Sequence, residues 1–263
     1  MKIDLAKIQS VCCEVAVEAG HKIMEIYNNE ELFRQVEYKK DNSPLTLADQ
    51  AANEVIVERL AREFPEYAIL SEEGQDNLER LNNPYCFIVD PLDGTKEFVK
   101  RNGQFTVNIA LSYEHHSIMG VIYVPATQEL YYASEGLGSY YVNAKGEQSA
   151  CQVSTQEDLT QVKLVMSGSH GCQEMEDLIK KYEFTNFIKM GSSLKGCLVA
   201  KGEAEIYYRH NPTMEWDTAA MQCIAEEAGA TFMQMDDTPM LYNRENSLND
   251  KGFYIINSKK NRI

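Results

Sequence analysis

The sequence lacks any long hydrophobic run. No stretch of 18 apolar residues occurs in its 263 residues, so no transmembrane segment is expected. Residues 1–10 include Asp4 and Lys7 and have no apolar centre of the kind found in secretion signals, which favours a cytoplasmic location. With 44% hydrophobic residues, a chain of this length can bury a full core as one large domain or two smaller ones.

Cysteine pairs and zinc-type cysteine spacing are also lacking. The seven cysteines are odd in number, Cys12 and Cys13 are adjacent, and no CxxC motif occurs. We interpret them as small buried hydrophobic residues in a reducing compartment.

Positive charge is scarce, with 25 Lys and Arg against 40 Asp and Glu and a net charge of −15. This balance argues against binding to long nucleic acids or anionic membranes. A small phosphorylated substrate is compatible with it, provided that metal cations or a local basic cluster hold the phosphate. The sequence does not decide between a monomer and a homodimer.

The first half of the chain combines helices with an antiparallel sheet. Apolar residues at steps of three and four predict helices over residues 5–26 and 49–64. Thr46 or Asp49 is expected to cap the second helix. Short strands follow at 68–70 and 86–90. Alternating apolar residues then predict an antiparallel meander with strands 104–112, 117–124, 129–134 and 139–142, with His115 and His116 exposed in a turn.

From about residue 150 the pattern changes to alternating strands and helices, so a domain boundary is expected near 151–160. We predict an N-terminal α+β metal-binding domain (1–152) and a C-terminal α/β substrate-recognition domain (153–263). The strands expected in the second domain are 162–167, 184–189, 205–208 and 253–257, and the helices are 173–182, 192–201 and 213–227. Residues 236–251 are polar and are expected to form a loop.

The stretch from Tyr85 to Val99 carries the clearest chemical signal. Its apolar strand should stop at Asp90, because Pro91 has no N–H for a sheet ladder. Gly94 permits an unusual backbone shape, and Thr95 suits a helix N-cap. The carboxylates could hold hard cations and the free N–H groups an anion. The alternative is a solvated turn, because Asp-Pro and Asp-Gly are common turn dipeptides.

Other acidic residues can contribute to a metal site only if the fold brings them close to Asp90 and Asp93. Asp49 by itself is a capping or surface carboxylate. Glu72 belongs to a turn unless strand 68–70 lies beside strand 86–90, which would bring it to Asp90. Asp217 stands near the start of a predicted helix, next to Trp216, which we interpret as core packing.

Taken together, these motifs resemble a known family. The segments Asp90-Pro-Leu-Asp-Gly-Thr95 and Trp216-Asp-Thr-Ala-Ala220 are similar to signatures of the lithium-sensitive, magnesium-dependent phosphatases of the inositol monophosphatase type. Lys96-Glu-Phe98, Phe105-Thr-Val-Asn-Ile-Ala110 and Gly191-Ser-Ser-Leu-Lys195 resemble the CysQ-type 3′(2′),5′-bisphosphate nucleotidases within it. The resemblance spans about residues 35–220 and implies a layered αβαβα fold.

The resemblance also implies a reaction and its metal site. It implies hydrolysis of the 3′-phosphate of adenosine 3′,5′-bisphosphate to AMP by an activated water, with two to three Mg²⁺ ions and inhibition by lithium. The implied magnesium ligands are Glu72, Asp90, the carbonyl of Leu92, Asp93 and Asp217. Thr95 would orient the water, and Asp49 would act through Thr95 as general base.

Further residues are implied as substrate contacts. The N–H groups of Gly94 and Thr95 would hold the scissile phosphate, and Glu72, Leu92, Asp93 and Asp217 would face it through the metals. Residues 39–44 resemble the family's lid. The second phosphate and the base would meet residues of the C-terminal half: His170, Ser192, Lys195 and Arg209.

Simpler interpretations of these C-terminal residues stay open. His170 could be a loop histidine, Ser192 a helix cap and Lys195 a surface lysine. Arg209 could be a strand-end arginine, with His210 and Lys201 near enough to compete for its role.

Two other functions remain open from the sequence. One is an inositol or sugar monophosphatase on the same fold, which would not require Lys195. The other is a non-catalytic metal or nucleotide sensor, against which the presence of Asp49, Thr95 and all the metal-binding acids argues. The sulfated analogue of the bisphosphate is a further candidate substrate.

Overall fold

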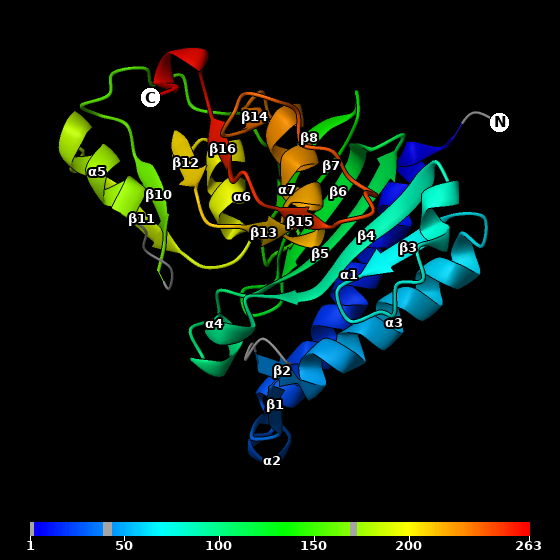
Figure 1. Ribbon diagram of the computed structural model, residues 1–263. Helices are drawn as coiled ribbons and strands as arrows, with labels where there is room; N and C mark the ends of the chain where they lie inside the picture. The colour runs from blue at the N-terminus through cyan, green and yellow to red at the C-terminus, as the bar shows by residue number, and fades with distance from the viewer. Residues whose placement is uncertain (1–2, 39–43, 169–172) are drawn as a thin grey trace.

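The computed structural model describes residues 3–38, 44–168 and 173–263. It has five layers (Figure 1). Helices α1 (Leu5–Tyr27) and α3 (Leu47–Glu63) cover one face of a seven-stranded sheet. Helices α6 (Leu194–Ala200) and α7 (Glu215–Glu227) fill the space between this sheet and a five-stranded sheet, and α5 (Gln173–Tyr182) covers the outer face of the latter. The expected αβαβα layering is confirmed.

The seven-stranded sheet follows the chain order from β3 to β9, and only the β3–β4 pair is parallel. Its strands are β3 (Ala68–Ser71), β4 (Tyr85–Asp93), β5 (Thr106–Tyr113), β6 (His116–Val124), β7 (Glu129–Ser134), β8 (Gly138–Val142) and β9 (Gln148–Ala150). This is the predicted meander, extended by β9. His115 and His116 are exposed at the β5–β6 hairpin, as expected.

The five-stranded sheet has the order β11-β10-β12-β16-β14. Its strands are β10 (Leu164–Ser167), β11 (Phe187–Met190), β12 (Ile206–Arg209), β14 (Thr231–Gln234) and β16 (Phe253–Ile256). Two small ladders complete the fold: β1 (Val36–Tyr38) with β2 (Pro44–Thr46), and β13 (Thr213–Met214) with β15 (Leu248–Asn249). Short helical turns lie at α2 (Glu30–Phe33), η1 (Glu79–Asn82) and η2 (Lys259–Asn261).

The sequence of β4 reflects burial on both faces. Phe87 and Val89 point toward α1 and α3, whereas Cys86 and Ile88 point toward α6 and α7. Because side chains alternate along a strand, a sheet covered on both faces gives a continuous apolar run.

The expectation that β4 stops at Asp90 is wrong. The strand runs through Pro91 to Asp93, and its pairing with β5 becomes irregular between Asp90 and Asp93. Two residues of β4 lie there opposite one residue of β5, as in a β-bulge. A bulge tolerates a proline, since its missing N–H is not needed for the ladder.

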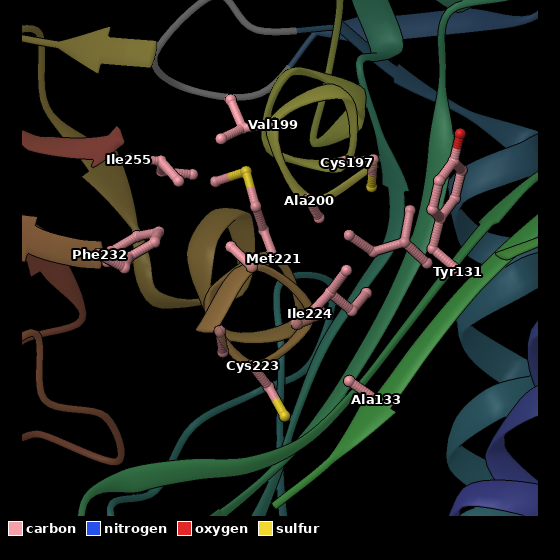
Figure 2. Packing of buried hydrophobic residues seen from close by; sticks show 14 of the residues in the cluster. Tyr131, Ala133, Cys197, Val199, Ala200, Met221, Cys223, Ile224, Phe232 and Ile255 are labelled. Carbon is pink, nitrogen blue, oxygen red and sulfur yellow. The ribbon is translucent and has the colours of Figure 1, made fainter. Parts of the chain in front are cut away.

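Helix α7 connects the two sheets. Figure 2 shows Met221 directed toward Ile255 of β16, with Ile224 on the side of Tyr131 of β7. The helix approaches β6 very closely: a Cβ added at Gly120 would lie 2.3 Å from the carbonyl oxygen of Ala220. The predicted domain boundary between residues 152 and 153 stays a prediction. Helix α7 packs against residues from both predicted domains.

The cysteines agree with their interpretation as apolar residues. Among the residues that the structure describes, the cysteines are free, and burial raises the pKa of Cys13 and Cys86 to about 12. Within the same residues, no helix has the length and apolar character required to span a bilayer.

Candidate active site

The parallel pairing of β3 with β4 brings two acidic residues together. Ser71 lies beside Val89, and the N–H of Glu72 donates to the carbonyl of Val89 at 3.1 Å. The next residue of β4 is Asp90, so Glu72 lies close to Asp90. The pairing of the two strands, on which this depended in the sequence analysis, is therefore present. Burial, followed by the negative charge of Glu72, raises the pKa of Asp90 well above its ordinary value.

Three aspartates from two distant segments form a compact cluster. Carboxylate oxygens of Asp90, Asp93 and Asp217 lie within 4.8 Å of one another. Asp217 comes from the first turn of α7, in the middle layer that packs against β4. Burial and the charge of Asp93 raise the pKa of Asp217 to about 7.

This donor set fits a hard divalent cation. Buried carboxylates of like charge disfavour ionisation, and a divalent cation would remove that penalty while accepting oxygen ligands. The compact cluster holds only the three aspartates, but the charge of Glu72 acts on the pKa of both Asp90 and Asp217, so a further carboxylate lies nearby. The residues therefore suit Mg²⁺ in chemistry.

Hydrogen bonds hold each aspartate of the cluster in place. Oδ2 of Asp93 accepts from the N–H of Ser193 at 2.6 Å and from its hydroxyl at 2.7 Å. Oδ1 of Asp90 accepts from the N–H of Leu92 at 3.0 Å. Oδ2 of Asp217 accepts from the N–H of Met214 at 2.6 Å. Such bonds fix carboxylate orientation before any cation binds.

Asp49 lies at the start of α3 and contacts Thr95, two residues after the end of β4. Thr46 is the N-cap, and Oδ2 of Asp49 accepts from the Thr46 N–H at 2.7 Å and from its hydroxyl at 2.6 Å. Its other oxygen accepts from the hydroxyl of Thr95 at 3.3 Å. Asp49 is 3% exposed, and burial raises its pKa to about 6 despite the Thr46 bonds. A capping carboxylate thus also reaches the acidic cluster.

The expected N-cap at Thr95 is one residue off. Gly94 is the N-cap of α4 (Thr95–Val99), with φ of 91°, and Thr95 is the first helical residue. A left-handed φ favours glycine here. The Thr95 hydroxyl is consequently available for Asp49 and for the carbonyl of Leu92, each at 3.3 Å.

A cavity of about 230 Å³ opens beside the acidic cluster. Asp93 and Asp217 form one wall, and Gly94 and Thr95 contribute the start of α4. Another wall comes from the C-terminal half and includes Ser192, Lys195, Tyr207 and Arg209.

Lys195 is a buried cation in this wall, so the surface-lysine alternative is wrong. Its side chain is 7% exposed, and Nζ donates to the carbonyl of Ser192 at 2.5 Å. Burial lowers its pKa to about 8, and the charge of Asp93 partly opposes this. Nζ lies 5.6 Å from the centre of the Tyr207 ring.

Two further polar groups of this wall have unused hydrogen-bonding capacity. Within the described part of the chain, Oγ of Ser192 and Nε of Arg209 are buried without a hydrogen-bond partner. An anionic ligand in the cavity would satisfy Nε of Arg209. Of its competitors, Lys201 pairs with Glu203 at 2.7 Å outside the cavity lining.

The structure brings most, but not all, of the predicted residues to one site. His170 and residues 39–43 of the suggested lid lie outside the described residues. Trp216 is partly buried against the middle-layer core, in agreement with a packing role.

Sequence reasoning missed two residues that support the site. Ser193, rather than Ser192, bonds Asp93, and Asn108 donates to the Ser193 hydroxyl at 2.8 Å. Asn108 is a buried polar residue between the apolar residues Val107 and Ile109 of β5. A polar residue within this buried strand was the sequence feature that could have identified it.

Comparisons with known proteins agree with this geometry. Residues 4–261 match the inositol monophosphatase family. The 3′(2′),5′-bisphosphate nucleotidase CysQ of Salmonella typhimurium is 39% identical over 249 residues, which cover 92% of this chain and 97% of that protein. The enzyme of the same name from Buchnera aphidicola is 39% identical over 254 residues, covering 94% of this chain and 93% of that protein.

Solved structures give the same result. The crystal structure of CysQ from Bacteroides thetaiotaomicron has a TM-score of 0.84 at 40% identity, covering 96% of this chain and 98% of that one. The suppressor protein SuhB of Bartonella henselae has a TM-score of 0.81 at 26% identity, covering 97% and 95%. With the family match spanning nearly its whole length, this chain belongs to the inositol monophosphatase family.

Proposed function

We propose that this chain is a magnesium-dependent 3′(2′),5′-bisphosphate nucleotidase that converts adenosine 3′,5′-bisphosphate to AMP and phosphate. The observation that carries the proposal is the identity of 39% to nucleotidases over 92% of the chain. The cavity supports it, because the cationic side chains of Lys195 and Arg209 line it together with Asp93 and Asp217. A substrate with two phosphates needs both a metal site and a separate cationic site.

Glu72, Asp90, Asp93, Asp217 and the carbonyl of Leu92 would hold the magnesium, as two to three ions. When bound, Mg²⁺ would neutralise charge on the phosphoryl oxygens and make a nearby water more acidic. The acids of this site supply only oxygen donors, the preferred ligands of Mg²⁺.

Thr95 and Asp49 would prepare the attacking water. The Thr95 hydroxyl donates to Asp49 at 3.3 Å, so its lone pairs are left to accept a hydrogen bond from water. As the water oxygen attacks phosphorus, its proton would pass to Thr95 while the Thr95 proton passes to Asp49. The bond between phosphorus and the ribose 3′-oxygen breaks, and its electron pair stays on that oxygen, which would take a proton from solvent water to become the 3′-hydroxyl of AMP. Inorganic phosphate is released.

The remaining groups would bind the two phosphates. N–H groups of Gly94 and Thr95, at the start of α4, would face the 3′-phosphate. Lys195 and Arg209 would bind the 5′-phosphate by charge-assisted hydrogen bonds. Ser192 lies next to them with its hydroxyl unpaired among the described residues. His170 stays a candidate contact to the nucleotide.

Phosphate release from two substrates tests the substrate class. With magnesium present, we expect faster turnover of adenosine 3′,5′-bisphosphate than of inositol 1-phosphate. Faster turnover of inositol 1-phosphate would instead identify a monophosphatase on the same fold.

A further inference from the structure

The polar loop between β14 and β16 contains a buried hydrogen-bond network that reaches the start of α7. Three of its members are almost fully buried: Glu215 at 0%, Asn249 at 1% and Asn243 at 3% exposure. Burying polar side chains at this depth costs free energy unless their hydrogen bonds are satisfied. The network adjoins Asp217 yet contains none of the proposed ligands.

Asn249 is the member that bonds the segment preceding Asp217. Its Nδ2 donates to the carbonyl of Met214 at 2.9 Å and to the hydroxyls of Thr213 and Thr218, each at 3.2 Å. The N–H of the same Met214 donates to Asp217 Oδ2 at 2.6 Å. One peptide segment therefore connects the Asn249 amide to the Asp217 carboxylate, and Thr213 also lines the cavity.

The rest of the network fixes Asn249. Nη2 of Arg244 donates to Asn249 Oδ1 at 2.6 Å, which determines the orientation of the amide. The Glu215 carboxylate accepts from Nε of Arg244 at 3.2 Å and from its N–H at 3.0 Å. Arg80 of η1, on the far side, donates to the carbonyl of Arg244 and to Oδ1 of Asn243, both at 2.8 Å.

We propose that Asn249 is a positioning residue that sets the Asp217 carboxylate for magnesium through the Met214 peptide. Without the Asn249 amide, the Met214 carbonyl and both threonine hydroxyls lose a buried donor, and the first turn of α7 is free to shift. The inference rests on the proposed function, because it takes Asp217 as a magnesium ligand.

The test compares Asn249→Leu with Asn257→Leu. Leucine approximates the shape of asparagine but cannot hydrogen-bond. Asn257 is a matched control: it is 8% exposed, its Nδ2 donates to the carbonyls of Ser154 and Gln156, and its Oδ1 accepts from Asn261. Both variants should lose stability without metal, since both leave buried carbonyls unpaired.

The decisive measurement is a magnesium titration that is monitored in two ways: by isothermal titration calorimetry and by the rise in melting temperature. Asn249→Leu should bind Mg²⁺ about tenfold more weakly, the lower end of the effect seen when groups supporting metal ligands are removed. Asn257→Leu should bind like the wild type. The magnesium concentration for half-maximal rate should rise in the same ratio.

Two results would overturn the inference in different ways. Unchanged magnesium affinity in Asn249→Leu, with a wild type that binds the metal, would refute the positioning role alone. Absence of magnesium binding in the wild type would refute the proposed function as well. If Asn249→Leu fails to fold, Arg244→Lys takes its place: it removes the bond to Oδ1 of Asn249 and should weaken magnesium binding severalfold, and unchanged affinity would refute the proposal.

Discussion

At the scale of single residues, Asp49 shows how one carboxylate serves two purposes. Its Oδ2 completes the start of α3 through Thr46, and its Oδ1 accepts from Thr95. The first contact was within reach of sequence reasoning, because Thr46 and Asp49 have the spacing of a helix cap. The second joins residues 46 positions apart, and only the family resemblance suggested it.

Asp49→Asn should therefore lower kcat strongly and leave magnesium binding unchanged. Asparagine retains the shape and accepts a hydrogen bond, but it cannot take the proton of the attacking water. Loss of a general base typically costs about 10²–10⁴-fold in rate. Steady-state kinetics and a magnesium titration check this, with Asp4→Asn as control, since Asp4 caps α1. A near-normal kcat would remove Asp49 from the proposed mechanism.

Lys195 is the single residue whose replacement should distinguish the two substrate classes. Replacing it with methionine keeps the apolar stem beside Tyr207 and removes the charge. KM for adenosine 3′,5′-bisphosphate should rise at least tenfold, because a hydrogen bond to a charged group is worth about 1.5–3 kcal/mol. Turnover of inositol 1-phosphate should change little. Lys201→Met is the control, and equal effects of both variants would argue against a 5′-phosphate contact.

At the scale of elements, periodicity predicted the framework well. Helices α1, α3, α5 and α7 and the meander from β5 to β8 lie where apolar spacing placed them. The short elements β9, β14 and α2 were not predicted, because segments of three or four residues give too weak a pattern to be recognised reliably. Tertiary pairing, which no local pattern contains, determines them.

The site depends on contacts between elements, and these were less predictable. Pro91 was expected to end β4, whereas a bulge carries the strand on to Asp93. Ser193 holds Asp93 across 100 residues of sequence. Glu72 could be placed only once β3 was known to pair with β4. The family motifs, rather than local propensity, indicated which of these distant residues belong to one site.

The seating of α7 on β6 gives a prediction for Gly120. A methyl group there would lie 2.3 Å from the Ala220 carbonyl oxygen, so the helix that carries Asp217 must move. Gly120→Ala should lower the free energy of unfolding by about 1–3 kcal/mol, the usual cost of overpacking. Chemical denaturation measures this. Gly136→Ala is not comparable because of its positive φ, so the control is Gly168→Ala: apart from its chain neighbours, no described residue comes within 4 Å of a Cβ added there. This variant should stay within about 0.5 kcal/mol of the wild type.

At the scale of the whole molecule, the buried acids couple stability to pH. Burial raises the pKa of Asp49 to about 6 and that of Asp217 to about 7, against about 3.9 in an unfolded chain. Between these values the folded protein binds protons that the unfolded chain has released. The free energy of unfolding of the metal-free protein should therefore fall as pH rises from about 4 to about 7.

Magnesium should reverse this loss, because it binds the ionised carboxylates of the folded state. The rise in melting temperature on adding Mg²⁺ should be larger at pH 8 than at pH 5. Burial lowers the pKa of His210, which acts in the opposite direction, but comparing samples with and without metal at each pH separates that contribution. An equal rise at both pH values would contradict a buried carboxylate metal site.

The proposed function requires the acidic cluster to support hydrolysis of the 3′-phosphate of the bisphosphate. The most direct test incubates adenosine 3′,5′-bisphosphate with the wild type and with Asp90→Asn in magnesium, and separates the nucleotide products by chromatography. We predict AMP and inorganic phosphate in equal amounts from the wild type, and a loss of rate of at least 10²-fold in Asp90→Asn. Binding of the nucleotide without turnover by the wild type, or an unchanged rate in Asp90→Asn, would contradict the account and favour a nucleotide sensor.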